Sequence, residues 1–132
     1  MTRVGRDFVR QRADGRCEYC RLPDFALAPE DFHVEHIIAR QHRGGDEPGN
    51  LAWACIYCKL YKGPNLRSID PDTGELTHLF HPRRDSWEEH FRMADTRISG
   101  RTAVGRTTLW LLEMNAEILV HVRASLMREG QW

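Results

Sequence analysis

Two Cys-x-x-Cys pairs, Cys17/Cys20 and Cys55/Cys58, constrain this chain more than any other feature, and they use all four of its cysteines. Each turn of this kind presents two thiolates at a spacing that zinc accepts. Two such turns far apart in sequence close a loop around one tetrahedral ion. The alternatives are disulfides or plain buried thiols, but nothing in the sequence points to an oxidising compartment. The sequence therefore predicts a structural zinc whose binding contributes folding free energy.

Length and composition indicate an ordinary globular protein. The chain has 132 residues, of which 41% are hydrophobic and 29% charged, and we expect a single domain over residues 1–132. The segment Met1–Gly5 has no apolar run of the kind found in signal peptides. No window is apolar for long enough to cross a bilayer. We therefore expect a cytoplasmic protein with no membrane partner.

The segment between the cysteine pairs predicts a β-hairpin followed by a helix. Residues 32–38 alternate in polarity, which favours a strand, and residues 50–54 form a plausible second strand. Gly44, Gly45 and Pro48 place a long loop between the two strands. The second cysteine pair then opens a short helix that ends at Gly63.

The flanking segments complete an α+β pattern with a core over residues 16–64 and an extension over residues 65–132. A short N-terminal helix ending near Gly15 is indicated by apolar residues at helical spacing: Val4, Phe8 and Val9. The extension is turn-rich up to residue 100 and contains short strand candidates near residues 76–80, 91–93 and 96–98. Two helices follow, the first from Thr102. The second is capped by Asn115 and buries four residues: Ile118, Leu119, Val122 and Leu126.

Between the two cysteine pairs, the side chains suited to catalysis are Glu35, His36 and Asn50. Hydrolysis of a phosphodiester needs a base for the attacking water, positive charge for the transition state and a group that orients the base. On a regular strand Glu35 and His36 point to opposite faces, so a shared site requires the strand to end or bulge between them. Asn50 lies on the returning strand, where a hydrogen bond from it would fix the imidazole.

Positive charge is concentrated in the middle of a chain whose formal net charge is zero. Residues 36–67 contain five Lys and Arg against two acidic residues, a local charge of about +3. A phosphate-facing patch and a solvated face are both consistent with this count. Lys62 follows Lys59 by three positions on the same helical face, from which it is predicted to reach phosphate.

Residues 17–63 resemble the HNH endonucleases that have a ββα-metal core and zinc knuckles with four cysteine ligands. The matching motifs are Cys17-Glu18-Tyr19-Cys20, His33-Val34-Glu35-His36-Ile37-Ile38, His42 before Gly44-Gly45, Asn50-Leu51-Ala52 and Lys62-Gly63. The resemblance implies DNA as substrate, His36 as general base, Asn50 as its orienting residue and Glu35 as ligand of a catalytic Mg²⁺ or Mn²⁺. Arg40 and His42 are further candidates for phosphate contact. Segments 79–87, 89–91 and 102–108 are similar to an extension found in a bacterial subgroup.

Lys59 departs from the family pattern, because this position is normally the Asn or His that provides the second protein ligand to the catalytic metal. A protonated lysine has no lone pair for a cation. Three outcomes are open. Glu35 and His33 bind a metal weakly, or Lys59 contacts the scissile phosphate itself, or the site is silent and the protein only binds DNA.

The leading interpretation is therefore a metal-dependent HNH endonuclease that hydrolyses DNA. The alternative is a catalytically impaired DNA-binding module, and a purely structural zinc domain that acts through protein partners is the third. The tryptophans Trp53, Trp87 and Trp110 are predicted to be core residues. Arg83 and Arg84 are each equally consistent with a DNA contact and with an internal ion pair.

Overall fold

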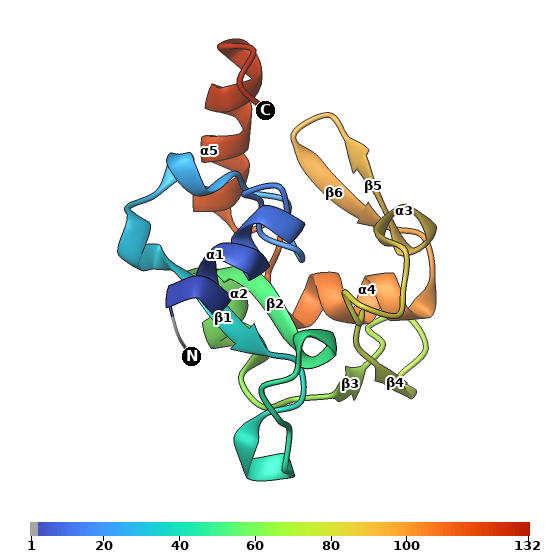
Figure 1. Cartoon of the computed structure of the whole chain (residues 1–132). Coiled ribbons are helices and arrows are strands. Elements are labelled where there is room, and N and C mark those ends of the chain that lie inside the picture. The colour runs from blue at the N-terminus through green and yellow to red at the C-terminus, as the bar shows by residue number, and fades with distance from the viewer. Residues whose placement is uncertain (1–2) are drawn as a thin grey trace.

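The computed structural model describes residues 3–132, which form five α-helices and three two-stranded antiparallel sheets (Figure 1). The helices are α1 (Arg3–Arg12), α2 (Ile56–Lys62), α3 (Trp87–His90), α4 (Ala103–Leu111) and α5 (Glu117–Arg128). The strands are β1 (Phe32–His36), β2 (Leu51–Cys55), β3 (Arg67–Ile69), β4 (Leu76–His78), β5 (Phe91–Ala94) and β6 (Arg97–Gly100). Short 3-10 turns lie at Asp24–Ala26, Pro29–Asp31, Arg40–His42 and Pro48–Asn50. The mixed α and β architecture expected from the sequence is confirmed.

The centre of the molecule is the hairpin β1–β2 followed directly by α2, as the sequence predicts. The two strands pair without interruption from Phe32 opposite Cys55 to His36 opposite Leu51. Every residue of β2 is buried, because α1 and the first cysteine turn cover it. The first turn is fastened to β2 through Glu18, whose backbone N–H donates to the Trp53 carbonyl at 2.8 Å. The Glu18 carboxylate in turn accepts from the Trp53 backbone N–H at 2.8 Å.

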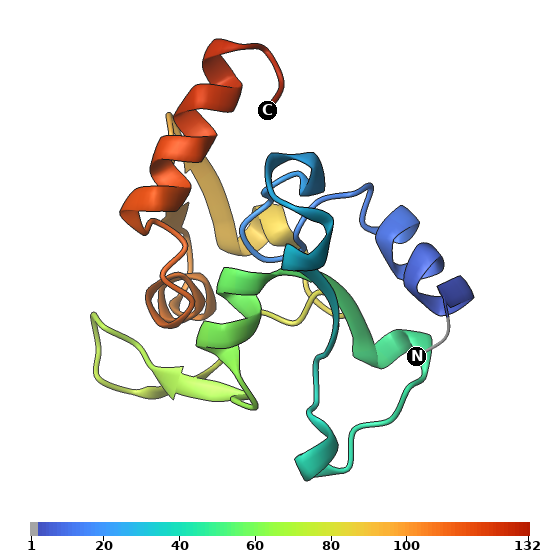
Figure 2. The ribbon, with the colours of Figure 1, turned by 90° about the vertical axis from the view of Figure 1, so that its left-hand side faces the viewer.

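The loop between β1 and β2 projects from the rest of the molecule and is drawn in teal at the bottom of both ribbon views (Figure 2). Its base is narrow. A Cβ on Gly44 would overlap the carbonyl oxygen of Ile38, so only glycine fits this close approach. Asn50, 5% exposed, closes the loop from the other side.

The extension packs against the cysteine-rich core through a continuous apolar cluster. Phe80, Trp87 and Phe91 share this cluster with Tyr19 and Trp53. The Trp87 indole N–H donates to the Tyr19 carbonyl at 2.7 Å, and Arg83 forms an ion pair with Glu18. The ion-pair interpretation of Arg83 is therefore the correct one. The division of the chain into residues 16–64 and 65–132 stays a prediction.

Three expectations about the flanking segments need correction. Asn115 does not cap α5: its side-chain amide pairs with both backbone groups of Ile98, and Ala116 stands at the cap position. Ile118 is 47% exposed and Trp110 57% exposed, so neither is a core residue. Phe8 is 49% exposed beside Arg12, whereas Val9 is fully buried, and the side chain of Val4 lies outside the described residues.

The extension has one helical turn, α3, beyond the two helices expected. Among residues 3–132 no helix has the length and apolar character needed to span a membrane.

Candidate functional site

The four cysteines converge on one point in the core. Their sulfur atoms all lie within 4.8 Å of one another, and all four residues are buried. The Sγ atoms of Cys20 and Cys55 are 3.7 Å apart, close to the edge of about 3.8 Å that a tetrahedron with Zn–S bonds of about 2.3 Å requires. Within the described part of the chain, no other group of three or more His, Cys, Asp and Glu side chains is arranged to hold a metal ion. The donor set fits a structural zinc, which would supply folding free energy and no chemistry.

His36 ends β1 at the mouth of the projecting loop. Its Nε2 lies 2.6 Å from Oδ1 of Asp46, and the guanidinium of Arg40 donates to the same oxygen at 3.1 Å. The hydrogen bond from His36, together with the Arg40 charge, lowers the pKa of Asp46, so the carboxylate is ionised at neutral pH. When a neutral imidazole donates through Nε2, its Nδ1 is left as proton acceptor. This is the arrangement that a general base needs.

Asn50 acts on the loop backbone. Its Oδ1 accepts from the Ile38 N–H at 2.8 Å, while its Nδ2 donates to the carbonyls of Ile38 at 3.0 Å and Gly45 at 2.9 Å. The expected bond to the imidazole is instead made by Asp46. Asn50 therefore joins the two ends of the loop that carries Asp46, and it affects His36 only through that loop.

Glu35 lies on the face of β1 opposite His36. The unbroken pairing of Glu35 with Ala52 and His36 with Leu51 contains no bulge, so successive side chains alternate between faces. The Glu35 carboxylate accepts from the Tyr19 hydroxyl at 2.7 Å and is only 5% exposed. Burial raises the pKa of Glu35, and burial together with the Glu35 charge raises the pKa of Tyr19 well above its usual value.

The prediction that Lys62 reaches phosphate is wrong. Lys62 is 1% exposed, and its ammonium donates to the Ile37 carbonyl at 2.9 Å. It also lies 3.4 Å from Oε1 of Glu35, an ion pair whose geometry does not make a hydrogen bond. In the structure α2 turns Lys62 toward the hairpin. However, the hairpin and the extension enclose the ammonium, and a buried lysine requires this kind of partner.

His33 shares a strand face with Glu35, and each has a buried side-chain atom without a hydrogen bond to any residue that the structure describes: Nε2 of His33 and Oε1 of Glu35. A cation would satisfy both atoms. The surrounding charge opposes this, because burial and then the charges of Lys59 and Arg6 lower the pKa of His33, while Lys62 already faces Glu35. As placed, these residues do not fit a catalytic divalent cation.

Arg40 and His42 lie on the projecting loop, in the 3-10 turn Arg40–His42. Both side chains are exposed. The loop thus presents cationic and imidazole groups to solvent beside the His36–Asp46 contact, where an approaching phosphate would meet them.

A hairpin with a long loop, a helix that follows it directly and a cluster of four cysteines that fastens both define a small metal-binding ββα domain. Residues 17–64 match the family model of the HNH endonucleases. The family is one of nucleases, and its substrates are nucleic acids. No curated protein and no solved structure matches the chain. The resemblance of residues 65–132 to a bacterial subgroup stays a prediction.

Two residues of the site do not stand out in the sequence. Asp46 lies ten positions after His36 in a glycine-rich loop, where an acidic residue is ordinarily a turn residue. Tyr19 lies within the first cysteine turn. Only the folded structure shows that it is buried and that its hydroxyl donates to Glu35. Both contacts depend on how distant segments close in space, for which the local sequence carries no signal.

With His36 as the general base of DNA cleavage, the mechanism proposed below, we expect Asp46→Ala to lower kcat by roughly 10- to 100-fold, with KM within about threefold of the wild-type value. The carboxylate positions the imidazole and does not bind substrate in this mechanism. Asp46→Asn should recover much of the loss, because its amide oxygen still accepts from Nε2. A rise in KM with unchanged kcat in Asp46→Ala would show that Asp46 acts on substrate binding instead.

Proposed function

We propose that this protein hydrolyses phosphodiester bonds of DNA, with His36 as the general base. The observation that supports this most strongly is the 2.6 Å contact between His36 Nε2 and Asp46, at the loop mouth of a segment that matches the HNH family. The contact leaves Nδ1 of His36 ready to accept a proton. A histidine that merely packs in a core has no need of an ionised partner at a solvent-facing loop.

The chemistry assigned to these residues has few steps. A water molecule loses a proton to Nδ1 of His36 and attacks phosphorus, the P–O bond to the leaving sugar oxygen breaks, and that oxygen takes up a proton. The transition state carries additional negative charge on the phosphoryl oxygens. Arg40, whose guanidinium lies 3.1 Å from the Asp46 carboxylate, is the cation beside the base that would stabilise this charge.

Dependence on a Mg²⁺ or Mn²⁺ ion at Glu35 is the part of the family pattern that these side chains support least. Lys62 holds a positive charge 3.4 Å from the carboxylate, and Lys59 stands where the second ligand belongs. Glu35 also faces away from His36. For Glu35 to hold a cation near the base, the Lys62 ion pair would have to break. The proposed mechanism therefore assigns no role to such an ion.

We expect Glu35→Gln to leave the response of cleavage to Mg²⁺ unchanged, while it lowers the free energy of unfolding by about 1–3 kcal/mol. In this mechanism the carboxylate is a buried structural partner of Tyr19 and Lys62. The measurement is the cleavage rate without added divalent cation and over a Mg²⁺ series, for the zinc-loaded variant and wild type. A tenfold or larger rise in the half-saturating Mg²⁺ concentration of the variant would place the ion on Glu35 and overturn this assignment.

A second candidate is a DNA-binding domain that does not cut. The observation that favours it is the positive charge on the Glu35 face of β1. Lys59 stands where the family has a metal ligand, and Lys62 already pairs with the Glu35 carboxylate that would bind the metal. This candidate predicts salt-sensitive DNA binding without cleavage.

The test of the main proposal is incubation of supercoiled plasmid with purified, zinc-loaded protein, in Mg²⁺, Mn²⁺, Ni²⁺ and without added divalent cation. Nicked or linear product in any of these conditions supports hydrolysis, provided that it disappears in His36→Ala. Intact plasmid at every protein concentration would eliminate the enzyme and leave the second candidate. A cytoplasmic location is part of the proposal, because four metal-binding thiols must stay reduced.

A further inference from the structure

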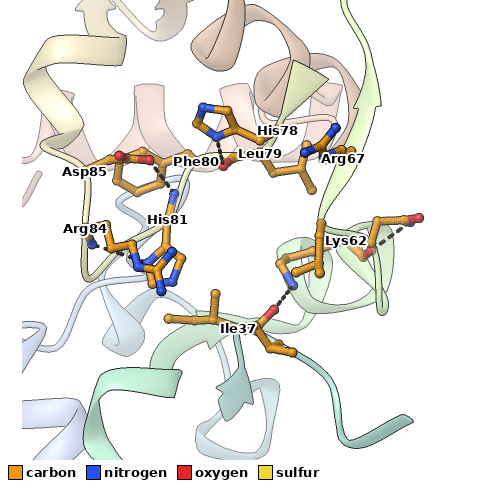
Figure 3. Close-up of a pocket in the computed structure, with 12 residues that line it drawn as sticks. Ile37, Lys62, Arg67, His78, Leu79, Phe80, His81, Arg84 and Asp85 are labelled. Atoms are coloured by element: carbon orange, nitrogen blue, oxygen red, sulfur yellow. Dashed lines mark hydrogen bonds between the residues drawn. The ribbon is translucent and has the colours of Figure 1, made fainter. Parts of the chain in front are cut away.

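The core and the extension enclose a pocket of about 380 Å³ that starts at the residue after His36. Ile37 forms its lower wall in the view of Figure 3, and four residues of the extension line its upper part: Arg67, His78, Leu79 and Phe80. Ile38 also lines the pocket. Across the pocket from Lys62 lie three further residues: His81, Arg84 and Asp85 (Figure 3). We refer to it as the core–extension pocket. Its volume falls in the range of roughly 300–1,000 Å³ found for small-molecule sites, so it can accept one nucleotide.

The charged side chains of this pocket that have no ion-pair partner in the described part of the chain are positive. Arg67 and Arg84 are both exposed, and neither forms an ion pair with any residue in the described part of the chain. Lys62 is neutralised by Glu35. The single acidic residue of the lining, Asp85, accepts from the His81 backbone N–H at 2.9 Å and so partly satisfies its charge within the chain. Two uncommitted guanidinium groups are suited to phosphate, which they bind with paired hydrogen bonds.

The two imidazoles of the pocket have defined hydrogen-bonding roles. Nδ1 of His81 accepts from the backbone N–H groups of Arg83 at 3.2 Å and Arg84 at 3.3 Å, so the ring proton is on Nε2 and can be donated. Nδ1 of His78 lies 3.1 Å from the Leu79 carbonyl, which only accepts, so this nitrogen carries a proton. Leu79 and Phe80, both buried, provide the apolar wall behind them. Phosphate ligands at the rim and an apolar wall inside match the two halves of a nucleotide.

The pocket lies close to His36 along the chain. Ile37 and Ile38 follow His36 directly in the chain, so the pocket begins within two residues of the proposed base. Because Lys62 lines it, the pocket lies on the Glu35 side of β1, and a DNA strand with a phosphate at His36 would pass the end of β1 to place a neighbouring nucleotide there. We propose that the core–extension pocket holds a nucleotide that flanks the cleaved bond, with its phosphate on Arg67 and Arg84. This inference rests on the proposed function and gives the extension a role in substrate binding.

The test is binding of a labelled 20-base-pair DNA duplex to the full chain in a His36→Ala background, which keeps the duplex intact. The pair Arg67→Ala and Arg84→Ala should weaken binding roughly 10- to 30-fold at 0.1 M salt, and it should reduce the slope of log K against log salt by about 1.8. The matched control is Arg92→Ala with Arg97→Ala, two exposed arginines on the distant β5–β6 hairpin. The control should stay within about threefold of the parent with an unchanged slope. Equal effects of the two pairs would overturn the proposal.

A second measurement follows the imidazole NMR signals of His78 and His81 during titration with the same duplex, with exposed His121 on α5 as reference. We expect the first two to shift and His121 to stay constant. Constant signals at both pocket histidines would contradict occupancy. The two proposals fail separately. Plasmid cleavage with pocket-independent binding eliminates only the pocket, and pocket-dependent binding without cleavage eliminates only the hydrolase.

Discussion

Removal of zinc should unfold this protein, which is the largest effect that we expect. The four thiols are buried in the middle of the apolar cluster that holds the core and the extension together. Without the ion, four thiolates or thiols crowd one point, and the link between the first cysteine turn and α2 is lost. Structural zinc sites contribute on the order of 10 kcal/mol or more to folding, which exceeds the stability of most domains of this size.

The measurement combines native mass spectrometry with circular dichroism. We expect one zinc per chain, loss of the folded spectrum in a strong chelator and recovery when zinc is added back. Cys17→Ser should behave like the chelated protein even in excess zinc, because serine is a poor zinc ligand. A chelated chain that keeps its spectrum and its melting temperature would show that apolar packing alone holds the fold.

Replacement of His36 with alanine should abolish cleavage while the fold remains. Removal of a general base typically costs roughly 10²–10⁴-fold in rate, and His36 is the proposed base with an ionised partner at 2.6 Å. Its side chain lies at the loop mouth with 19% exposure, so its loss leaves no large cavity in the core. We therefore expect a melting temperature and a DNA affinity close to those of the wild type.

The matched control is His121→Ala, because His121 is exposed on α5, away from the loop. It should cut at the wild-type rate. His42→Ala tests the loop itself: a loss smaller than that of His36→Ala is expected if His42 contacts phosphate. Cleavage by His36→Ala within about tenfold of the wild-type rate would remove His36 from the mechanism.

The cysteine cluster and the hairpin were predictable from the sequence, because each is specified by residues close together in the chain. Cys-x-x-Cys spacing, the alternation in residues 32–38 and the glycines after His42 each specify a short element. The structure contains all of them, with the strand ending at His36. Side-chain roles were predicted less well, because they depend on closure between distant segments. Helical spacing turns Lys62 toward the hairpin, but only the packed extension buries it beside Glu35.

Closure between distant segments also explains why the predicted roles of Asn115 and Trp110 were wrong. An Asn before an apolar helix is typical of a cap, but β6 offers it two backbone partners through Ile98, and they replace the cap. Trp110 has apolar neighbours in sequence, but its side chain stays 57% exposed on α4. Alternation on β1 was the most informative local rule. It allowed Glu35 and His36 to share a site only if the strand ended or bulged between them, and the pairing continues through both residues without a bulge.

The proposed mechanism is tested most sharply by comparing wild-type protein with Lys59→Asn in one plasmid-cleavage experiment, at matched concentrations and in the same divalent salts. The variant restores the ligand type that the HNH family uses at this position, while the Lys62–Glu35 ion pair remains in place. We predict that the wild type cuts and that Lys59→Asn cuts no faster, because hydrolysis depends on His36 and not on a cation held at Glu35. An inert wild type beside an active Lys59→Asn would contradict this mechanism and identify the natural protein as a DNA-binding domain with a silent site.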